Sequence, residues 1–189
     1  MNKAKKIRSM MLAMAALLTF GFAFTSCSND EDFPPATNTV TINGTTVNVR
    51  NVVRESGTAI DGGTTNYYEI FYVFINDNEG AAVYIPTKHL GKTMDLTEKW
   101  GIDGDIPNGL YLFFNDKEYA FFSPDENGDF SGNIKEGTMT VTVSDGKVNI
   151  YAKGIGLQYD KNHPEADPVE IPFEVSYSGP YTIEEIKET

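Results

Sequence analysis

Cysteine, histidine, tryptophan and basic residues are all scarce in this chain of 189 residues. It contains one Cys, two His, one Trp and 15 Lys or Arg residues against 27 Asp or Glu residues. A single cysteine excludes an internal disulfide framework, a cysteine-rich zinc site and a CxxC redox pair. The formal net charge of -12 repels phosphate backbones, so we expect no nucleic-acid partner.

Recognisable catalytic motifs are also missing. The sequence has no Gly-x-Ser-x-Gly elbow for a hydrolase nucleophile, and its glycines have neither P-loop nor dinucleotide-binding spacing. Neither His89 nor His163 lies in a motif that would make it a catalytic base. We therefore expect a protein that is not an enzyme. A glycan hydrolase that uses two carboxylates stays open as an alternative, because 27 acidic residues bring some pair within range in any fold.

Acidic residues cluster at three places in the chain: 103–105, 125–129 and 160–167. Clustered oxygen ligands suit calcium, but none of the clusters has the spacing of the helical calcium-binding loop. We expect no cofactor and assign no catalytic, cofactor-binding or metal-ligating residue. A structural calcium ion at one of these clusters stays open.

The N-terminus has the layout of a secretory signal. Four basic residues within the first eight positions precede an uncharged apolar run, Met10–Phe24. This run of about 15 residues is shorter than the roughly 20 needed to span a bilayer as a helix. The pattern predicts a signal peptide over residues 1–26.

The apolar run ends at Phe24-Thr25-Ser26-Cys27, with small residues directly before the only cysteine. This segment resembles the lipobox of bacterial lipoproteins, although Phe24 stands where leucine is usual. The resemblance implies cleavage after Ser26 and acylation of Cys27. Multiple acyl chains hold a protein stably at a bilayer, so the implied partner of Cys27 is the membrane.

An acidic run, Asp30–Asp32, follows the cysteine and leads into a proline-containing stretch. Together with the lipobox, it is similar to the export signal of surface-exposed lipoproteins of Bacteroidetes. The resemblance implies an outer-membrane lipoprotein that faces the cell exterior, tethered through residues 27–38. The periplasmic leaflet stays open as an alternative.

From Thr39 to Thr189 the chain alternates between apolar and polar residues, with turn signals between the runs. Asn43-Gly44 and Asp145-Gly146 predict two hairpins. Pro172 places the strand around it, or that end of the strand, at a sheet edge. About nine to eleven short strands predict one all-β domain over residues 39–189, either an antiparallel β-sandwich or a flattened meander β-barrel.

Two central strands, around 67–75 and 81–85, are apolar or aromatic on both faces. Such strands are covered on both sides or expose a patch that a ligand covers. Aromatic rings give contact area at low entropic cost, so Trp100, Tyr67, Tyr72 and Tyr84 are the candidate ligand contacts. The long segments 87–109 and 154–168 are the loops where we first expect function.

We therefore expect a cell-surface lipoprotein with a non-enzymatic binding or assembly role, which recognises a glycan or a protein. Two alternatives stay open. The first is the carboxylate-based hydrolase, and the second is a structural or accessory subunit of a surface appendage or an outer-membrane transporter, which would pair through an edge strand.

Overall fold

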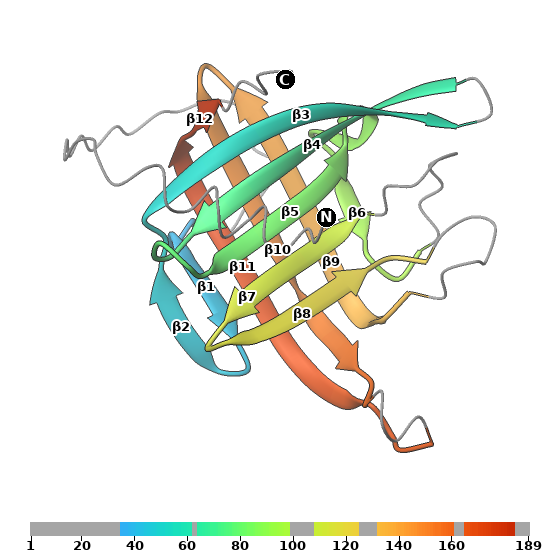
Figure 1. Cartoon of the computed structure of the whole chain (residues 1–189). Coiled ribbons are helices and arrows are strands. Elements are labelled where there is room, and N and C mark those ends of the chain that lie inside the picture. The colour runs from blue at the N-terminus through green and yellow to red at the C-terminus, as the bar shows by residue number, and fades with distance from the viewer. Residues whose placement is uncertain (1–34, 62–63, 99–107, 125–131, 161–164, 184–189) are drawn as a thin grey trace. The chain divides into compact units, whose positions relative to one another are not determined.

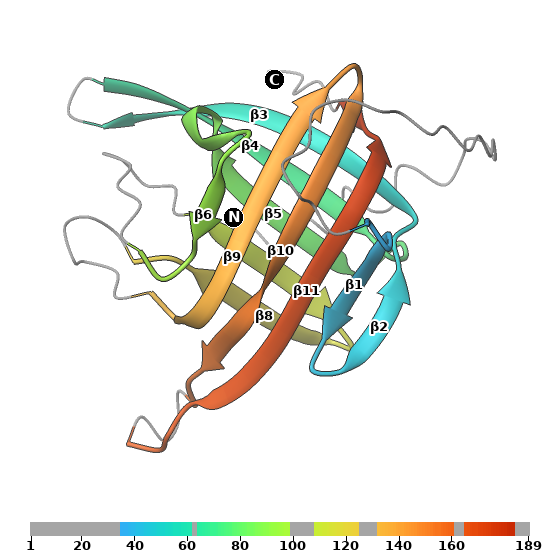
Figure 2. The same cartoon turned by 180° about the vertical axis from the view of Figure 1, so that it is seen from behind.

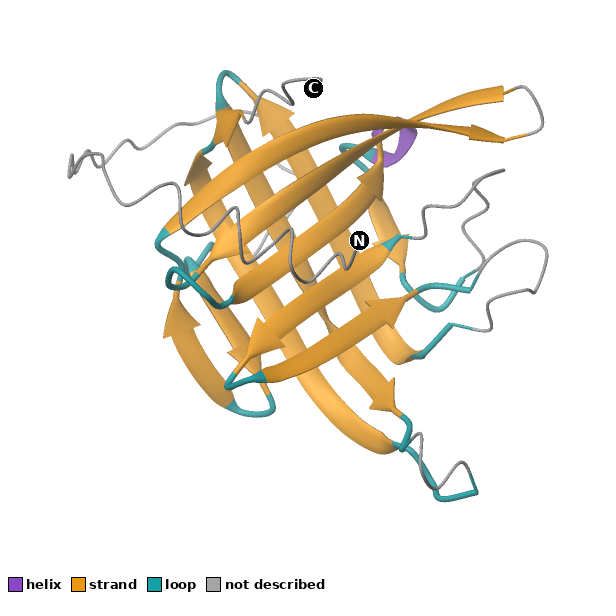
Figure 3. Cartoon of the chain, viewed as in Figure 1, coloured by secondary structure: helices purple, strands orange, loops and turns teal. Residues whose placement is uncertain are grey.

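The computed structural model describes residues 35–61, 64–98, 108–124, 132–160 and 165–183. The chain separates into two units, Met1–Pro35 and Ala36–Thr189, and the described strands lie in the second. They form two six-stranded sheets (Figures 1 and 3). The prediction of an all-β sandwich is confirmed. Within the described ranges, no helix is long and apolar enough to cross a membrane.

The first sheet is antiparallel and has the strand order β2-β1-β11-β10-β9-β6. Figure 2 shows it in front. Its strands are β1 (Thr39–Ile42), β2 (Thr45–Asn48), β6 (Thr93–Asp95), β9 (Ile134–Ser144), β10 (Lys147–Gln158) and β11 (Val169–Pro180).

The second sheet has the order β12-β3-β4-β5-β7-β8 and is antiparallel except that β12 runs parallel to β3. It lies in front in Figure 1, where its strands cross those of the first sheet steeply. Its strands are β3 (Asn51–Asp61), β4 (Thr64–Phe74), β5 (Gly80–Pro86), β7 (Gly109–Phe114), β8 (Lys117–Phe122) and β12 (Thr182–Ile183). A 3-10 turn, η1 (Thr87–His89), follows β5.

Apolar side chains from both sheets meet in one core between them. The ring of Phe121 on β8 stacks on that of Phe173 on β11, with centroids 5.3 Å apart. Two glycines of β10 make room for this pair: a Cβ atom at Gly156 would lie 2.2 Å from the Phe121 ring, and one at Gly154 would lie 2.9 Å from Phe173. Larger residues at either position would push the stacked rings apart.

The predicted hairpin turns are present. Asn43-Gly44 joins β1 to β2 and Asp145-Gly146 joins β9 to β10, each with both residues at positive φ. This backbone conformation matches the twist of a hairpin and favours Asn, Asp and Gly. The β7–β8 hairpin turns at Asn115-Asp116 in the same way.

The structure describes twelve strands, slightly more than the alternation predicts. The short strands β6 and β12 contain three and two residues, too few for an alternating pattern to be recognised. The alternating pattern does not predict β3, because Arg54 and Glu55 both lie within it and interrupt the apolar alternation. Residues 154–158 belong to β10, so the second expected loop begins later than predicted.

Strand β11 is an interior strand between β1 and β10, and the end that carries Pro172 extends beyond its pairing with β1. The N–H of Asn43, in the β1–β2 turn, donates to the Pro172 carbonyl at 2.8 Å. The nitrogen and carbonyl of one antiparallel residue point to the same side, so the Pro172 nitrogen faces this turn, beyond the last residue of β1. The missing donor therefore costs no ladder hydrogen bond.

Asn133 ties the two sheets together beside β8. Its Oδ1 accepts from the Phe122 N–H at 2.9 Å, and its side-chain amide donates to the Ala120 carbonyl. Its own carbonyl accepts from the Leu157 N–H of β10 at 2.7 Å. One residue thus satisfies backbone groups at the end of β8 and on the opposite sheet.

Candidate functional site

The outer face of the second sheet is rich in aromatic side chains. Strand register places Val53, Tyr72, Ala82, Tyr111 and Ala120 in one row across five strands. The adjacent row contains Glu55, Ile70, Tyr84, Gly109 and Phe122. We call this surface the aromatic face and define it by its partly exposed rings: Tyr68, Tyr72, Phe74, Tyr84, Tyr111, Phe113 and Phe122.

Glu55 lies among the tyrosines of this face and is only 7% exposed. The Tyr72 hydroxyl donates to its Oε2 atom at 2.9 Å. Tyr68 and Tyr72 flank Ile70, which lies directly opposite Glu55 on β4. Burial, and then the negative charge of Glu55, raise the pKa of both Tyr68 and Tyr84, so these hydroxyls stay protonated and able to donate at neutral pH.

A second carboxylate, Glu118, lies at the other side of the aromatic face. Burial, followed by a hydrogen bond with Glu118, raises the pKa of Tyr111. The ring of Tyr84 meets that of Phe122 edge-on, with centroids 5.8 Å apart and an interplanar angle of 70°. The aromatic face thus combines ring surfaces with hydroxyl donors and carboxylate acceptors.

Two glycines hold aromatic rings against the sheet. A Cβ atom at Gly57 would lie 2.3 Å from the Tyr68 ring, and one at Gly109 would lie 2.5 Å from the Phe122 ring. Both rings therefore lie over a glycine of the neighbouring strand. A side chain at either position would lift the ring away from the sheet.

The structure places two of the predicted ligand contacts on the same face of the sheet and a third on the opposite face. Tyr72 and Tyr84 both belong to the aromatic face. Tyr67 alternates to the other side of β4, where the strand extends beyond its pairing with β5, and is 64% exposed. Trp100 and the acylation site Cys27 lie outside the described residues.

Three residues of the aromatic face, Tyr68, Tyr111 and Glu55, are not among the ligand contacts that the sequence predicts. Tyr68 stands beside Tyr67 in a run that is apolar on both faces, so the run itself signals a second aromatic surface without saying which tyrosine belongs to it. The register of β4 against β3 and β5 decides that question. Nothing in the sequence around Glu55 indicates that it is buried.

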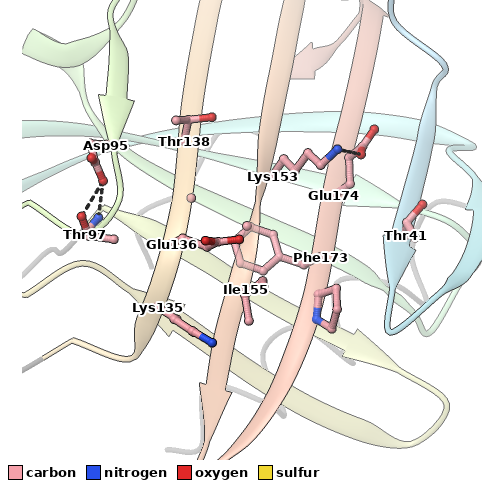
Figure 4. Close-up of a pocket in the computed structure, with 13 residues that line it drawn as sticks. Thr41, Asp95, Thr97, Lys135, Glu136, Thr138, Lys153, Ile155, Phe173 and Glu174 are labelled. Atoms are coloured by element: carbon pink, nitrogen blue, oxygen red, sulfur yellow. Dashed lines mark hydrogen bonds and ion pairs between the residues drawn. The ribbon is translucent and has the colours of Figure 1, made fainter.

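The outer face of the first sheet is polar and carries a shallow hollow of about 670 Å³ (Figure 4). Register places Thr41, Glu174, Lys153, Thr138 and Asp95 in one row across five strands. Lys153 forms an ion pair with Glu174 at 3.5 Å. The Lys153 side chain is well exposed, and that of Glu174 is partly exposed. The charged side chains on the outer face of the first sheet are thus paired with each other or exposed to solvent.

His89, in the first of the two expected loops, is buried, at 6% exposed. Its Nδ1 lies 3.4 Å from Oδ1 of the fully buried Asn108. Burial lowers the His89 pKa, the contact with Asn108 opposes this, and Lys88 and Lys92 add to the lowering. His163 lies outside the described residues.

No group of three or more His, Cys, Asp or Glu side chains within the described ranges could hold a metal ion. Of the three acidic clusters in the sequence, 103–105 and 125–129 lie wholly outside these ranges, and residues 161–164 of the third cluster also lie outside them. Compared by sequence and by structure, the chain matches no family model, no curated protein and no solved structure.

Proposed function

We propose that this chain is a lipid-anchored outer-membrane protein that binds a saccharide chain on the aromatic face. The observation that carries the proposal is the grouping of seven partly exposed rings, four of them tyrosines, on one side of one sheet. Flat rings stack on the apolar faces of sugars, while tyrosine hydroxyls and carboxylates form hydrogen bonds with sugar hydroxyl groups.

Binding without catalysis is supported by the spacing of the two carboxylates on this face. Glu55 on β3 and Glu118 on β8 are separated by four strand intervals, or about 19 Å at about 4.8 Å per interval. A glycosidase needs its two carboxyl groups roughly 5 to 10 Å apart. This pair is therefore unsuited to glycoside hydrolysis, and we favour recognition over turnover.

A saccharide array probed with the detergent-solubilised full chain tests the proposal. We expect Tyr84→Ala and Tyr111→Ala each to weaken saccharide binding about tenfold, because a central aromatic contact contributes on the order of 1–2 kcal/mol. Tyr151→Ala is the matched control, since Tyr151 is a partly exposed tyrosine on the outer face of the first sheet. An equal loss in this control, or capture of a protein with no saccharide bound, would contradict the proposal.

The anchoring part of the proposal is tested separately, by fractionating cells that express the full chain. We expect the wild-type protein in the outer-membrane fraction and Cys27→Ser in the soluble fraction, because the substitution removes the acylation site. Protease treatment of intact cells distinguishes the outer surface from the periplasmic leaflet. Membrane retention of Cys27→Ser would refute lipidation at this position.

A further inference from the structure

Two buried glutamates of the second sheet differ in how their charge is compensated. Glu69, at 4% exposed, receives two hydrogen bonds from the Arg54 guanidinium, at 2.8 and 2.9 Å, and one from Ser56 at 2.6 Å. Glu55, at 7% exposed, accepts a hydrogen bond from the Tyr72 hydroxyl. Burying an ionised carboxylate is costly unless a cation or several donors compensate it.

The described outward positions of β3, β4, β5, β7 and β8 hold no lysine, arginine or histidine. Among the residues that the structure describes, Glu55 therefore has no lysine, arginine or histidine on its own face. Each carboxylate oxygen can accept two hydrogen bonds, and the Tyr72 hydroxyl occupies one of these sites. Glu55 retains acceptor capacity for a donor that comes from outside the chain.

The rings around Glu55 favour a cation as that donor. Tyr68 and Tyr72 lie on either side of the position opposite Glu55, and Tyr84 lies in the same row one strand further. The face of a tyrosine ring attracts an ammonium group within about 6 Å of its centroid. Tyrosine rings near a carboxylate can therefore add to its attraction for such a group.

We infer that Glu55, with Tyr68, Tyr72 and Tyr84, binds the ammonium group of an amino sugar within the saccharide chain. The inference rests on the proposed function, because it names the sugar that the aromatic face selects. The ammonium group donates charge-assisted hydrogen bonds to Glu55 while its positive charge lies against the tyrosine rings. A carboxylated or sulfated sugar would be repelled by the same carboxylate.

Matched oligomers of glucosamine and N-acetylglucosamine test the inference, because they differ in the charge of one group per sugar. The full chain is titrated with each by calorimetry in detergent, in mildly acidic buffer that keeps the amines protonated. We expect at least tenfold tighter binding of the glucosamine oligomer, and we expect Glu55→Gln to abolish this preference. Glu136→Gln is the control, since it removes the same charge from an exposed position on the outer face of the first sheet.

The outcomes separate the inference from the proposed function. Equal affinity for the two oligomers overturns the amino-sugar inference and leaves saccharide binding intact. If neither oligomer binds, the inference is overturned even when the saccharide array shows binding of another sugar. A preference that survives in Glu55→Gln, or that disappears equally in Glu136→Gln, overturns the assignment to Glu55. If Glu55→Gln does not fold, Tyr68→Leu replaces it, with a reduced amine preference as the expected result.

Discussion

The two sheets of the sandwich differ in where they place their charges. On the first sheet, Lys153 pairs with Glu174 and Lys135 with Glu170 on the outer surface, where the side chains are between 32% and 61% exposed. On the second sheet, Glu55 and Glu69 are nearly inaccessible to solvent. Exposed pairs contribute little to stability, whereas a buried charge must be compensated by specific partners.

This difference separates charges that are exposed at the surface from charges that constrain the structure. Arg54 contacts Glu69 through both oxygens and also donates to the Tyr181 hydroxyl at 3.1 Å. Its guanidinium lies over the Tyr181 ring at 5.5 Å, directly before β12. The buried pair thus fixes the C-terminal strand against β3, which no pair on the first sheet's surface does.

The largest expected effect is on the buried pair. Arg54→Ala should lower the free energy of unfolding by about 3–5 kcal/mol, because it leaves Glu69 buried without its cation. Lys153→Ala, which breaks an exposed pair, should cost less than about 1 kcal/mol. Denaturant unfolding of both variants checks the difference, and equal losses would show that the two sheets do not differ in this respect.

A smaller effect of opposite sign is expected at Glu55. Glu55→Met should raise the free energy of unfolding by about 0.5–2 kcal/mol, because it removes a buried carboxylate without a protein cation. The same variant should lose the preference for the glucosamine oligomer. Glu136→Met, at an exposed position of the first sheet, is the control for stability and should change it by less than about 0.5 kcal/mol. A destabilised Glu55→Met would indicate a structural role for Glu55.

The smallest expected effect is a pH dependence that differs between His89, in the turn after β5, and Asp95, on the first sheet. The His89 pKa is lowered by burial from its ordinary value of 6.5, so the unfolded chain binds this proton first and stability falls as the pH drops below 6.5. The slope is at most about 1.4 kcal/mol per pH unit for one group. Unfolding of the wild type and His89→Gln over this range should differ in slope.

Asp95 on the first sheet provides the comparison for His89. Hydrogen bonds from the Thr97 hydroxyl and backbone N–H lower its pKa below the ordinary value of 3.8. The stabilisation is present above pH 3.8 and is lost as the pH falls through the lowered pKa. Asp95→Asn should therefore alter the pH dependence only in the acidic range, and an altered slope near pH 6 would contradict this assignment.

Much of the fold could be predicted from local sequence. Alternating residues around Asn43-Gly44 and Asp145-Gly146 identify both hairpins, because the turn conformation and the side-chain period are local properties. The aromatic face could be predicted only in part. Tyr72 and Tyr84 were identified as candidates, but the exclusion of Tyr67 and the inclusion of Tyr68 follow from pairing with β3 and β5.

The sequence by itself determined the all-β class and the hairpin turns, and its N-terminal pattern is the basis for the anchor that we propose. Only the tertiary structure decided that the two sheets remain separate, and that Glu55 is buried among tyrosines while Glu174 stays at the surface. The physical reason is the separation along the chain between the residues that interact. Turns and alternation depend on neighbouring residues, whereas burial and ion pairing depend on strands far apart in the chain.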